Sequence, residues 1–196
     1  MDGKQHGLAT KWYENGRKSS EASFENGRQE GLSIFWYANG QKKETSIFKE
    51  GRRDGLMISW YENGLRQSRV NLRNGKRHGL ATRWYENGEM GQATYENGKQ
   101  DGLSTGWYEN GWKKWGSNWK DGERNGRTTR WYDNGQKSLE ENYKDGKLVS
   151  AVAWKRNGRK CPVTKIDEDG NGVYVWYNED GTESFRIFFK NGQRVN

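Results

Sequence analysis

One short phrase returns along the whole chain at a nearly constant spacing, and this regularity limits the possible folds more than any other feature. Copies of Trp-Tyr-Glu-Asn-Gly or its variants begin 22 to 24 residues apart, at Trp12, Trp36, Trp60, Trp84, Trp107, Trp131, Trp154 and Trp176. A period of this length is typical of repeat architectures, in which each unit packs mainly against its neighbours. The sequence therefore predicts an array of eight related units.

Each repeat carries two glycine-marked segments that indicate β-hairpins. Asn-Gly follows Trp-Tyr closely, and about half a period later comes a second marker such as Phe24-Glu-Asn-Gly27. A helix would have to absorb a glycine about every seventh residue, at about 1 kcal/mol each relative to alanine. We therefore predict two extended segments per repeat, joined at one end by a tight two-residue Asn-Gly turn. At the other end we expect a looser Gly-x-x-x-Gly connection.

The alternation of side chains predicts two different faces for each strand. Leu32, Ile34 and Trp36 share one face, which we call the Leu/Trp face. Ser33, Phe35 and Tyr37 share the other, which we call the Tyr-bearing face. We expect the Leu/Trp face to form the core and the Tyr-bearing face to be half solvated. A two-residue turn at Asn39-Gly40 would place Tyr37 opposite Lys42, and Gly31 opposite Phe48, where the glycine would leave room for the ring.

Composition excludes several classes of protein. Hydrophobic residues make up 30% of the 196 residues and charged residues 31%, which suits a sheet of stacked units better than a globule with a deep core. The sequence has no apolar run long enough for a membrane span and no apolar signal segment at its start. We expect a cytoplasmic protein, although the chain opens within a repeat, so a leading segment could be missing.

Residues that could carry chemistry are few and do not form a recurring set. His6 and His78 stand in a turn column otherwise filled by acids or an amide, and Cys161 is the single cysteine. The acidic stretch Asp167 to Gly172 imitates the first half of a calcium loop, but the twelfth position is Asn178, where such a loop needs a bidentate Glu. We therefore expect no enzymatic activity, no cofactor and no bound metal.

Basic residues fall into two columns, one after each turn, within a formal net charge of +8. The first column comprises Lys18, Lys42, Arg66, Lys113, Lys137 and Lys160, and the second comprises Lys4, Arg28, Arg52, Lys76, Lys99 and Lys147. Stacked repeats would turn each column into a stripe able to receive an acidic protein, nucleic acid or anionic lipid. Alternatively, lysines at hairpin ends prevent edge pairing and keep the array soluble.

The iterated Trp-Tyr-Glu-Asn-Gly-Gln-Lys-Lys and Tyr-x-Asp-Gly-Lys phrases resemble the MORN-repeat variant of many bacterial proteins, whose members are often described as YwqK-like antitoxins. The resemblance is close from Gly3 to about Gly146 and loose beyond it. It implies an all-β fold: an elongated single antiparallel sheet, a solenoid-like meander of about eight hairpins, that acts by binding and has no catalytic residues. We expect regular repeats over 1–146 and divergent terminal repeats over 147–196 that form a C-terminal cap.

The resemblance suggests an antitoxin or immunity protein that masks a cognate toxin sterically. The alternatives are a scaffold or an array that binds anionic phospholipid, and, third, a module that binds cell-wall glycans. We expect a protein partner, with anionic lipid as the alternative and nucleic acid disfavoured. Because tyrosine and cationic side chains often dominate interfaces, the expected contact residues are Tyr37, Tyr61, Tyr85, Tyr108, Tyr132, Lys42, Arg66, Lys113 and Lys137.

Overall fold

The computed structural model describes residues 3–161, 164–178 and 182–195. These residues form seventeen β-strands, assigned to one antiparallel sheet, and no helix. The all-β class and the antiparallel meander of hairpins are therefore confirmed. No helix able to cross a membrane occurs in this part of the chain. The chain divides into two compact units, Met1–Asn87 with Thr94–Lys99 and Gly88–Ala93 with Gln100–Asn196.

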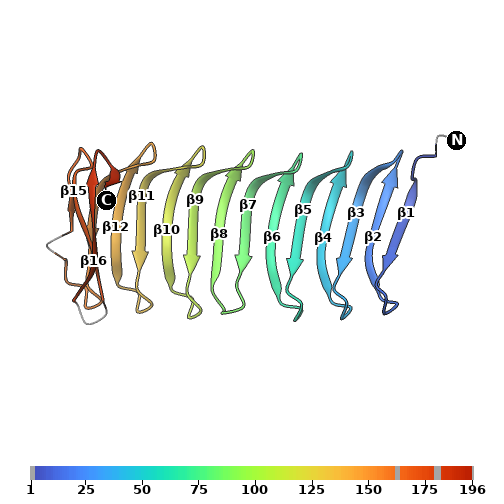
Figure 1. Cartoon of the computed structure of the whole chain (residues 1–196), viewed down its shortest axis with the longest axis horizontal. Coiled ribbons are helices and arrows are strands. Elements are labelled where there is room, and N and C mark those ends of the chain that lie inside the picture. Colours follow the sequence, from blue (N-terminus) through green and yellow to red (C-terminus); the bar gives the residue numbers. More distant parts are fainter. Residues whose placement is uncertain (1–2, 162–163, 179–181, 196) are drawn as a thin grey trace. The chain divides into compact units, whose positions relative to one another are not determined.

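In the first unit each strand pairs antiparallel with the next along the chain (Figure 1). Its strands are β1 (Gly7–Trp12), β2 (Lys18–Glu25), β3 (Arg28–Trp36), β4 (Lys42–Lys49), β5 (Arg52–Trp60), β6 (Arg66–Arg73) and β7 (Lys76–Trp84). The next strand, β8 (Met90–Glu96), contributes residues to both units.

The second unit continues the same hairpin pattern and ends in shorter, less regular strands. Its strands are β9 (Lys99–Trp107), β10 (Lys113–Lys120), β11 (Glu123–Trp131), β12 (Lys137–Lys144), β13 (Lys147–Ala153), β14 (Lys165–Ile166), β15 (Gly172–Tyr177), β16 (Glu183–Lys190) and β17 (Gln193–Val195). Each pairs antiparallel with its successor, and β13 joins β14 through the single pair Ala151 and Ile166. The predicted boundary between residues 146 and 147 stays a prediction.

The tight turn lies at the second marker of the six regular repeats and in the last hairpin, so our assignment of the two turn types was wrong. Asn26 and Gly27 both have positive φ, 50° and 79°, and connect the directly paired Glu25 and Arg28. This is the two-residue hairpin turn whose twist matches that of the strands. The same pair of positive φ values recurs at Glu50-Gly51, Asn74-Gly75, Asn97-Gly98, Asp121-Gly122, Asp145-Gly146 and Asn191-Gly192.

The turn after Trp-Tyr is a three-residue loop in which only the glycine has positive φ. The Tyr37 N–H donates to the Gln41 carbonyl, and the Gly40 N–H donates to the Tyr37 carbonyl. The Asn39 side chain accepts the Gln41 N–H at 2.9 Å, which explains why asparagine recurs at a position that does not need a left-handed backbone.

A bulge after this loop corrects the register. Lys42 pairs with Trp36, not with Tyr37, and the next pair is Phe35 with Glu44. The bulge residue Lys43 thus offsets the extra loop residue, and beyond it the pairing is that of a two-residue turn. The predicted pairing of Tyr37 with Lys42 was therefore wrong.

Gly31 pairs with Phe48, as predicted, but the expected reason was wrong. A Cβ added to Gly31 would meet no atom within 4 Å, so the glycine is not needed to make room for the ring. Gly31 has a φ of 75° at an irregularity in the pairing of β3 with β2. Glycine is favoured here because side-chain-bearing residues rarely adopt that backbone conformation.

Burial in the regular repeats does not follow the predicted core assignment, although Thr82, Thr105 and Thr129 of the Leu/Trp face are buried. Leu32 on the Leu/Trp face is 53% exposed, whereas Ser33 on the Tyr-bearing face is fully buried. Leu8, Leu80 and Leu103 are likewise exposed, and Ser46, Ser104 and Thr128 are buried. A row of small side chains lies along the middle of the Tyr-bearing face because larger neighbours cover it, among them Arg53, which hydrogen-bonds Ser46 and Glu44.

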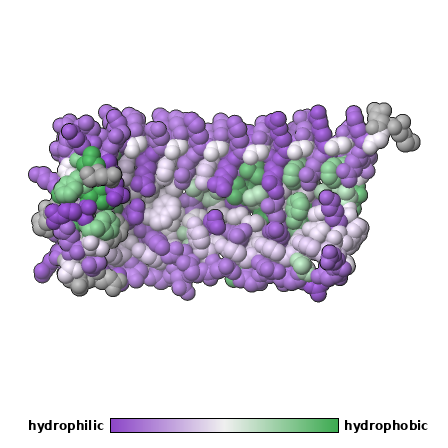
Figure 2. All heavy atoms as spheres, viewed as in Figure 1, coloured by the Kyte–Doolittle hydropathy of each residue, from purple (hydrophilic) through white to green (hydrophobic). Residues whose placement is uncertain are grey.

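The main apolar cluster of the described residues lies at the C-terminal end. It comprises Leu139, Leu148, Ala151, Ala153, Cys161, Ile166 and Tyr174, with Tyr143, Tyr177, Ile187 and Phe189 packed against it. Leu139 and Ala151 belong to the Tyr-bearing face, because they pair with Arg130 and Glu141 in its rows. Figure 2 shows hydrophobic side chains over the C-terminal strands and over several earlier strands, and polar side chains along the turns.

Candidate functional site

Tyrosine hydroxyls form a ladder between consecutive repeats. The Tyr37 Oη donates to the main-chain carbonyl of Trp60 at 2.9 Å, and the Tyr61 Oη donates to the Trp84 carbonyl at 3.0 Å. In the second unit, Tyr108 and Tyr132 donate in the same way to Trp131 and Trp154. Each bond satisfies a carbonyl next to an irregular turn and fixes one ring edge. The hydroxyls of four predicted contact residues therefore have structural partners, while Tyr85 is 46% exposed.

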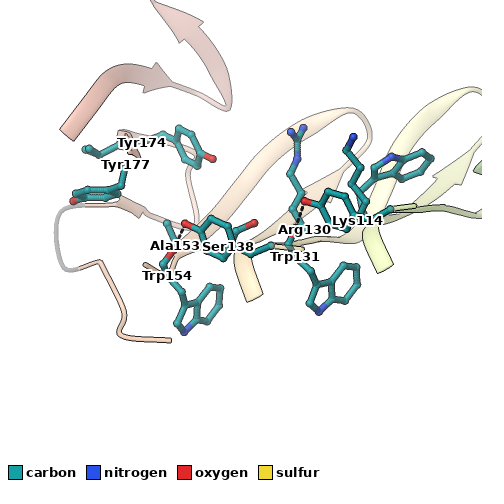
Figure 3. Close-up of a pocket in the computed structure, with 12 residues that line it drawn as sticks. Lys114, Arg130, Trp131, Ser138, Ala153, Trp154, Tyr174 and Tyr177 are labelled. Atoms are coloured by element: carbon teal, nitrogen blue, oxygen red, sulfur yellow. Dashed lines mark hydrogen bonds between the residues drawn. The ribbon is translucent and has the colours of Figure 1, made fainter. Parts of the chain in front are cut away.

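A pocket of about 220 Å³ opens on the Tyr-bearing face of the second unit (Figure 3). It is lined by Tyr108, Lys114, Trp115, Arg130, Trp131, Tyr132, Ser138, Ala153, Trp154, Tyr174, Val175 and Tyr177. Strands β9 to β13 and their turns supply one wall, and β15 supplies Tyr174, Val175 and Tyr177. The indoles of Trp131 and Trp154 point away from the tyrosines of β15 in Figure 3, so these residues contribute mainly their carbonyls.

One local departure from the repeat, together with a bulge that recurs in other repeats, builds the pocket. Trp115 stands where earlier repeats have Ser20, Glu44 or Ser68, and directly across the strand pair β9–β10 stands Gly106. A Cβ on Gly106 would overlap the Trp115 indole, so the glycine lets the ring lie over β9. A β-bulge at Lys114 aims its side chain to the same side as Arg130 (Figure 3).

Cations and carboxylates alternate around the aromatic rings. The Lys114 Nζ lies 5.2 Å from the centre of the Tyr108 ring and forms an ion pair with Glu89. Arg156 lies 5.8 Å from the centre of the Tyr132 ring and pairs with Asp133. Each cation is held between a ring face and an acid, which fixes its position at the site.

The ionisation of the buried groups follows from their burial. Glu141 is 8% exposed, and burial raises the pKa of its carboxyl above the usual range, although Arg130 and Arg124 oppose this. Burial also raises the pKa of Tyr174 strongly, with Glu141 as a second cause. Tyr108 and Tyr132 have pKa values raised by burial too. All three phenols are therefore neutral at pH 7 and able to donate hydrogen bonds.

Most of the first basic column lies on the Leu/Trp face, over the indole of the following repeat. Arg66 lies 5.5 Å from the centre of the Trp84 ring, Lys113 lies 6.0 Å from that of Trp131, and Lys137 lies 5.6 Å from that of Trp154. Lys42 is exposed and pairs with Trp36. The predicted tyrosine and lysine contact residues are thus not brought together, because they belong to opposite faces of the sheet.

Sequence reasoning found Tyr108 and Tyr132 but missed the residues that turn their surroundings into a pocket. Trp115 and Gly106 interrupt their repeat columns, and that interruption was the available signal. Arg130 and Lys114 gave no such signal, because Arg83 and Lys43 stand at the same positions of earlier repeats. Tyr174 and Tyr177 could not be placed, because the repeat pattern gives no rule for the packing of the divergent last hairpin.

Cys161 and the acidic stretch at Asp167, the other candidates for chemistry, lie in surroundings that serve the fold. Cys161 is buried in the C-terminal cluster, and burial raises the pKa of its thiol, which disfavours the reactive thiolate. The stretch beginning at Asp167 forms a turn in which the Asp167 carboxylate accepts the Asn171 N–H at 2.8 Å. No group of three or more potential metal-ligating side chains occurs among the described residues.

Family comparisons identify the type of repeat. The MORN repeat variant matches residues 5–26, 29–50 and 124–150, and the MORN repeat matches residues 71–90 and 168–181. None of the curated proteins matches the chain. The matched segments lie in both units and include the hairpin formed by β1 and β2. The chain is therefore built from MORN-type repeats.

Proposed function

We propose that this protein binds a protein partner through the Tyr-bearing face of its second unit, and that it acts as an antitoxin of the YwqK-like type by covering a toxin sterically. The observation that carries the proposal is the pocket, where Tyr108 and Tyr132 meet Trp115, Lys114 and Arg130. Aromatic and arginine side chains around a concave site are the features that concentrate binding energy at protein interfaces.

Steric masking suits the chemistry of this surface. The pocket offers rings, cations and neutral phenols, and the groups that could act as bases or nucleophiles are occupied or buried. Tyr108 and Tyr132 donate to carbonyls, and Glu141 lies beneath the surface. Rings fixed by hydrogen bonds lose little side-chain entropy when a partner docks, which favours binding.

Site-specific photo-crosslinking in cells of the source organism tests this proposal. A benzophenone amino acid would replace Lys114 beside the pocket or, as a control, Leu103, which is 58% exposed on the Leu/Trp face. We expect one protein crosslinked from Lys114 and absent from Leu103. That protein should arrest growth when expressed alone and be harmless when expressed with this chain. A partner captured only from Leu103, or no crosslinked protein at all, would contradict the proposal.

A second candidate function is binding to an anionic membrane surface through the Leu/Trp face. It is favoured by the exposed leucines, Leu8 at 65% and Leu32 at 53%, beside indoles that carry Lys or Arg over their rings. Apolar side chains next to cations suit the headgroup region of an anionic bilayer. Co-sedimentation with phosphatidylserine vesicles, lost in a Leu32→Asp and Leu80→Asp double variant and unaffected by substitution of Lys114, would support this candidate over the first.

A further inference from the structure

We propose that the pocket on the Tyr-bearing face of the second unit receives one aromatic side chain from an acidic segment of the partner. This inference rests on the proposed protein-binding function and specifies the chemistry of the partner at that site.

The size of the pocket favours a single side chain. Its volume of about 220 Å³ lies below the roughly 300–1,000 Å³ typical of sites that enclose a cofactor or a drug-sized ligand. A pocket of this volume therefore suits one ring system from a partner better than an independent small molecule. The contacts around an anchor side chain also exclude water from the open side of its pocket, so a small, partly open pocket is sufficient.

The walls favour an aromatic ring. Trp115 lies over Gly106 on one side, and Tyr174 and Tyr177 of β15 face the sheet from the other. Tyr108 and Tyr132 are held by their hydroxyl bonds to the Trp131 and Trp154 carbonyls. An inserted ring would therefore meet fixed ring faces and edges, the arrangement in which aromatic pairs attract each other.

Charge favours acidic residues beside that ring. Lys114 and Arg130 line the pocket, and Lys155 and Arg156 lie over its Tyr177 and Tyr132 rings. These four cations face three carboxylates: Glu89 on Lys114, Asp133 on Arg156, and the buried Glu141 near Arg130. Among these described residues the cations outnumber the acids, and none of the three acids lines the pocket, whereas Lys114 and Arg130 do. A partner segment with carboxylates flanking its anchor would complement this field.

The chain's own last hairpin shows that this surface accepts an aromatic ring beside charged groups. Tyr174 of β15 is 6% exposed, packs in the cluster with Leu139 and Ala151, and lies close enough to Arg130 and Glu141 for their charges to affect its pKa. The pocket is the adjoining open space along the same face. A partner ring would occupy a position comparable to that of Tyr174, one step further along the sheet.

Titration of the ¹⁵N-labelled protein with short peptides tests the inference. The probe is acetyl-DEWED-amide, and the comparison peptides are acetyl-DEAED-amide and acetyl-KKWKK-amide. We expect saturable shifts of the Trp115 indole N–H and of amides in β10, β11 and β15, with both comparison peptides binding at least about tenfold more weakly. Equal affinity for the alanine or the lysine peptide would overturn the inference. So would shifts of the same signals by a trisaccharide of N-acetylglucosamine with none by the probe.

Two variants with matched controls locate the binding. Ser138→Phe fills the pocket and should weaken probe binding about tenfold or more, whereas Ser19→Phe, at the same repeat position outside the pocket, should change it less than about twofold. Lys114→Gln should weaken binding about threefold and reduce its salt dependence, and Lys43→Gln, which removes the cation over Tyr37, should not.

The Lys114→Gln variant still tests the inference if the Ser138→Phe variant does not fold. Unchanged probe binding in the Lys114→Gln variant would overturn the acidic part of the inference. A partner crosslinked from Lys114 in cells together with no peptide binding would overturn the anchor chemistry and leave the proposed function standing. Peptide binding without a crosslinked partner would contradict the proposed function alone.

Discussion

At the scale of single residues, two neighbouring carboxylates of β12 have pKa values shifted in opposite directions, one by a nearby charge and the other by burial. Glu140 lies on the Leu/Trp side and accepts a hydrogen bond from Lys137 at 2.8 Å, which lowers its pKa. Glu141 points into the covered Tyr-bearing face, where its Oε2 has no hydrogen-bond partner among the described residues and burial raises its pKa. Adjacent residues of one strand therefore give opposite pH dependences to folding.

Replacing Glu141 with Gln should raise the melting temperature at pH 7. Folding raises the pKa of Glu141 above the ordinary glutamate value near 4.3. Between these two pKa values the native state binds more protons than the unfolded state, so stability falls as the pH rises from the lower pKa to the higher one. Gln removes the buried charge and keeps the shape. Thermal unfolding measured by circular dichroism should show a gain at pH 7 that disappears toward pH 4.

Glu140→Gln is the matched control and should have the opposite effect. Folding lowers the pKa of Glu140. Its carboxylate therefore contributes fully to the stability of the fold above the ordinary glutamate pKa, and this contribution is lost as the pH falls through the folded-state pKa. We expect a loss of about 0.2–1 kcal/mol at pH 7, since the pair with Lys137 is partly exposed. A lower melting temperature for Glu141→Gln at pH 7 would contradict the dominance of burial at that carboxyl.

Residue identity predicted some of these roles and left others open. Periodicity placed Tyr108 and Tyr132 on one face correctly, because alternation along a strand depends only on the backbone. It did not reveal that their hydroxyls bind the Trp131 and Trp154 carbonyls, since that depends on the offset between repeats. The burial of Glu141 was equally hidden, because it depends on packing near Tyr174 of β15, which comes from a distant part of the sequence.

At the scale of elements, the same dipeptide serves two different turns. Asn63-Gly64 belongs to a three-residue loop in which the Asn63 side chain accepts the Leu65 N–H. Asn74-Gly75 forms a two-residue turn with both residues in the left-handed region. Sequence predicted the hairpins but exchanged the turn types, because Asn-Gly suits both for different reasons.

Glu50→Asn should stabilise the protein. Glu50 occupies the first position of a two-residue turn with a φ of 50°, which Asn tolerates better than Glu. Its N–H bond to the Glu30 carboxylate involves only the main chain of residue 50 and is retained. We expect a gain of about 0.5–1 kcal/mol in the free energy of unfolding, measured by urea titration.

Glu62→Asn provides the comparison for that turn variant. Glu62 is also an exposed turn glutamate, but it lies in the three-residue loop, where its φ is not positive. The free energy of unfolding of the Glu62→Asn variant should differ by less than about 0.5 kcal/mol from that of the unchanged protein. Equal effects of the two substitutions would show that backbone conformation is not the cause.

At the scale of the whole molecule, the burial of large apolar side chains is uneven. The fully buried residues of the regular repeats are mainly small and polar, such as Ser33, Ser46 and Ser104, whereas Leu139 and Val175 are fully buried at the C-terminal end. The repeats thus depend on strand pairing, on the tyrosine ladder and on asparagine side chains such as that of Asn39, which donates to the Glu62 carbonyl of the next repeat. The end of the chain adds a small apolar core, which the repeat pattern could not predict because its last hairpin departs from that pattern.

Leu139→Ala should therefore destabilise the protein far more than the same change at an exposed repeat leucine. Leu139 is 2% exposed inside the apolar cluster, so truncation leaves a cavity and should cost about 2–5 kcal/mol. Leu103 of β9 is 58% exposed, so Leu103→Ala should cost less than about 0.5 kcal/mol. Urea unfolding gives both values, and hydrogen exchange should show the lost protection in β12, β13 and β15 first. A large effect at Leu103 instead would restore the Leu/Trp face as the core, against the burial of Ser33 and its equivalents.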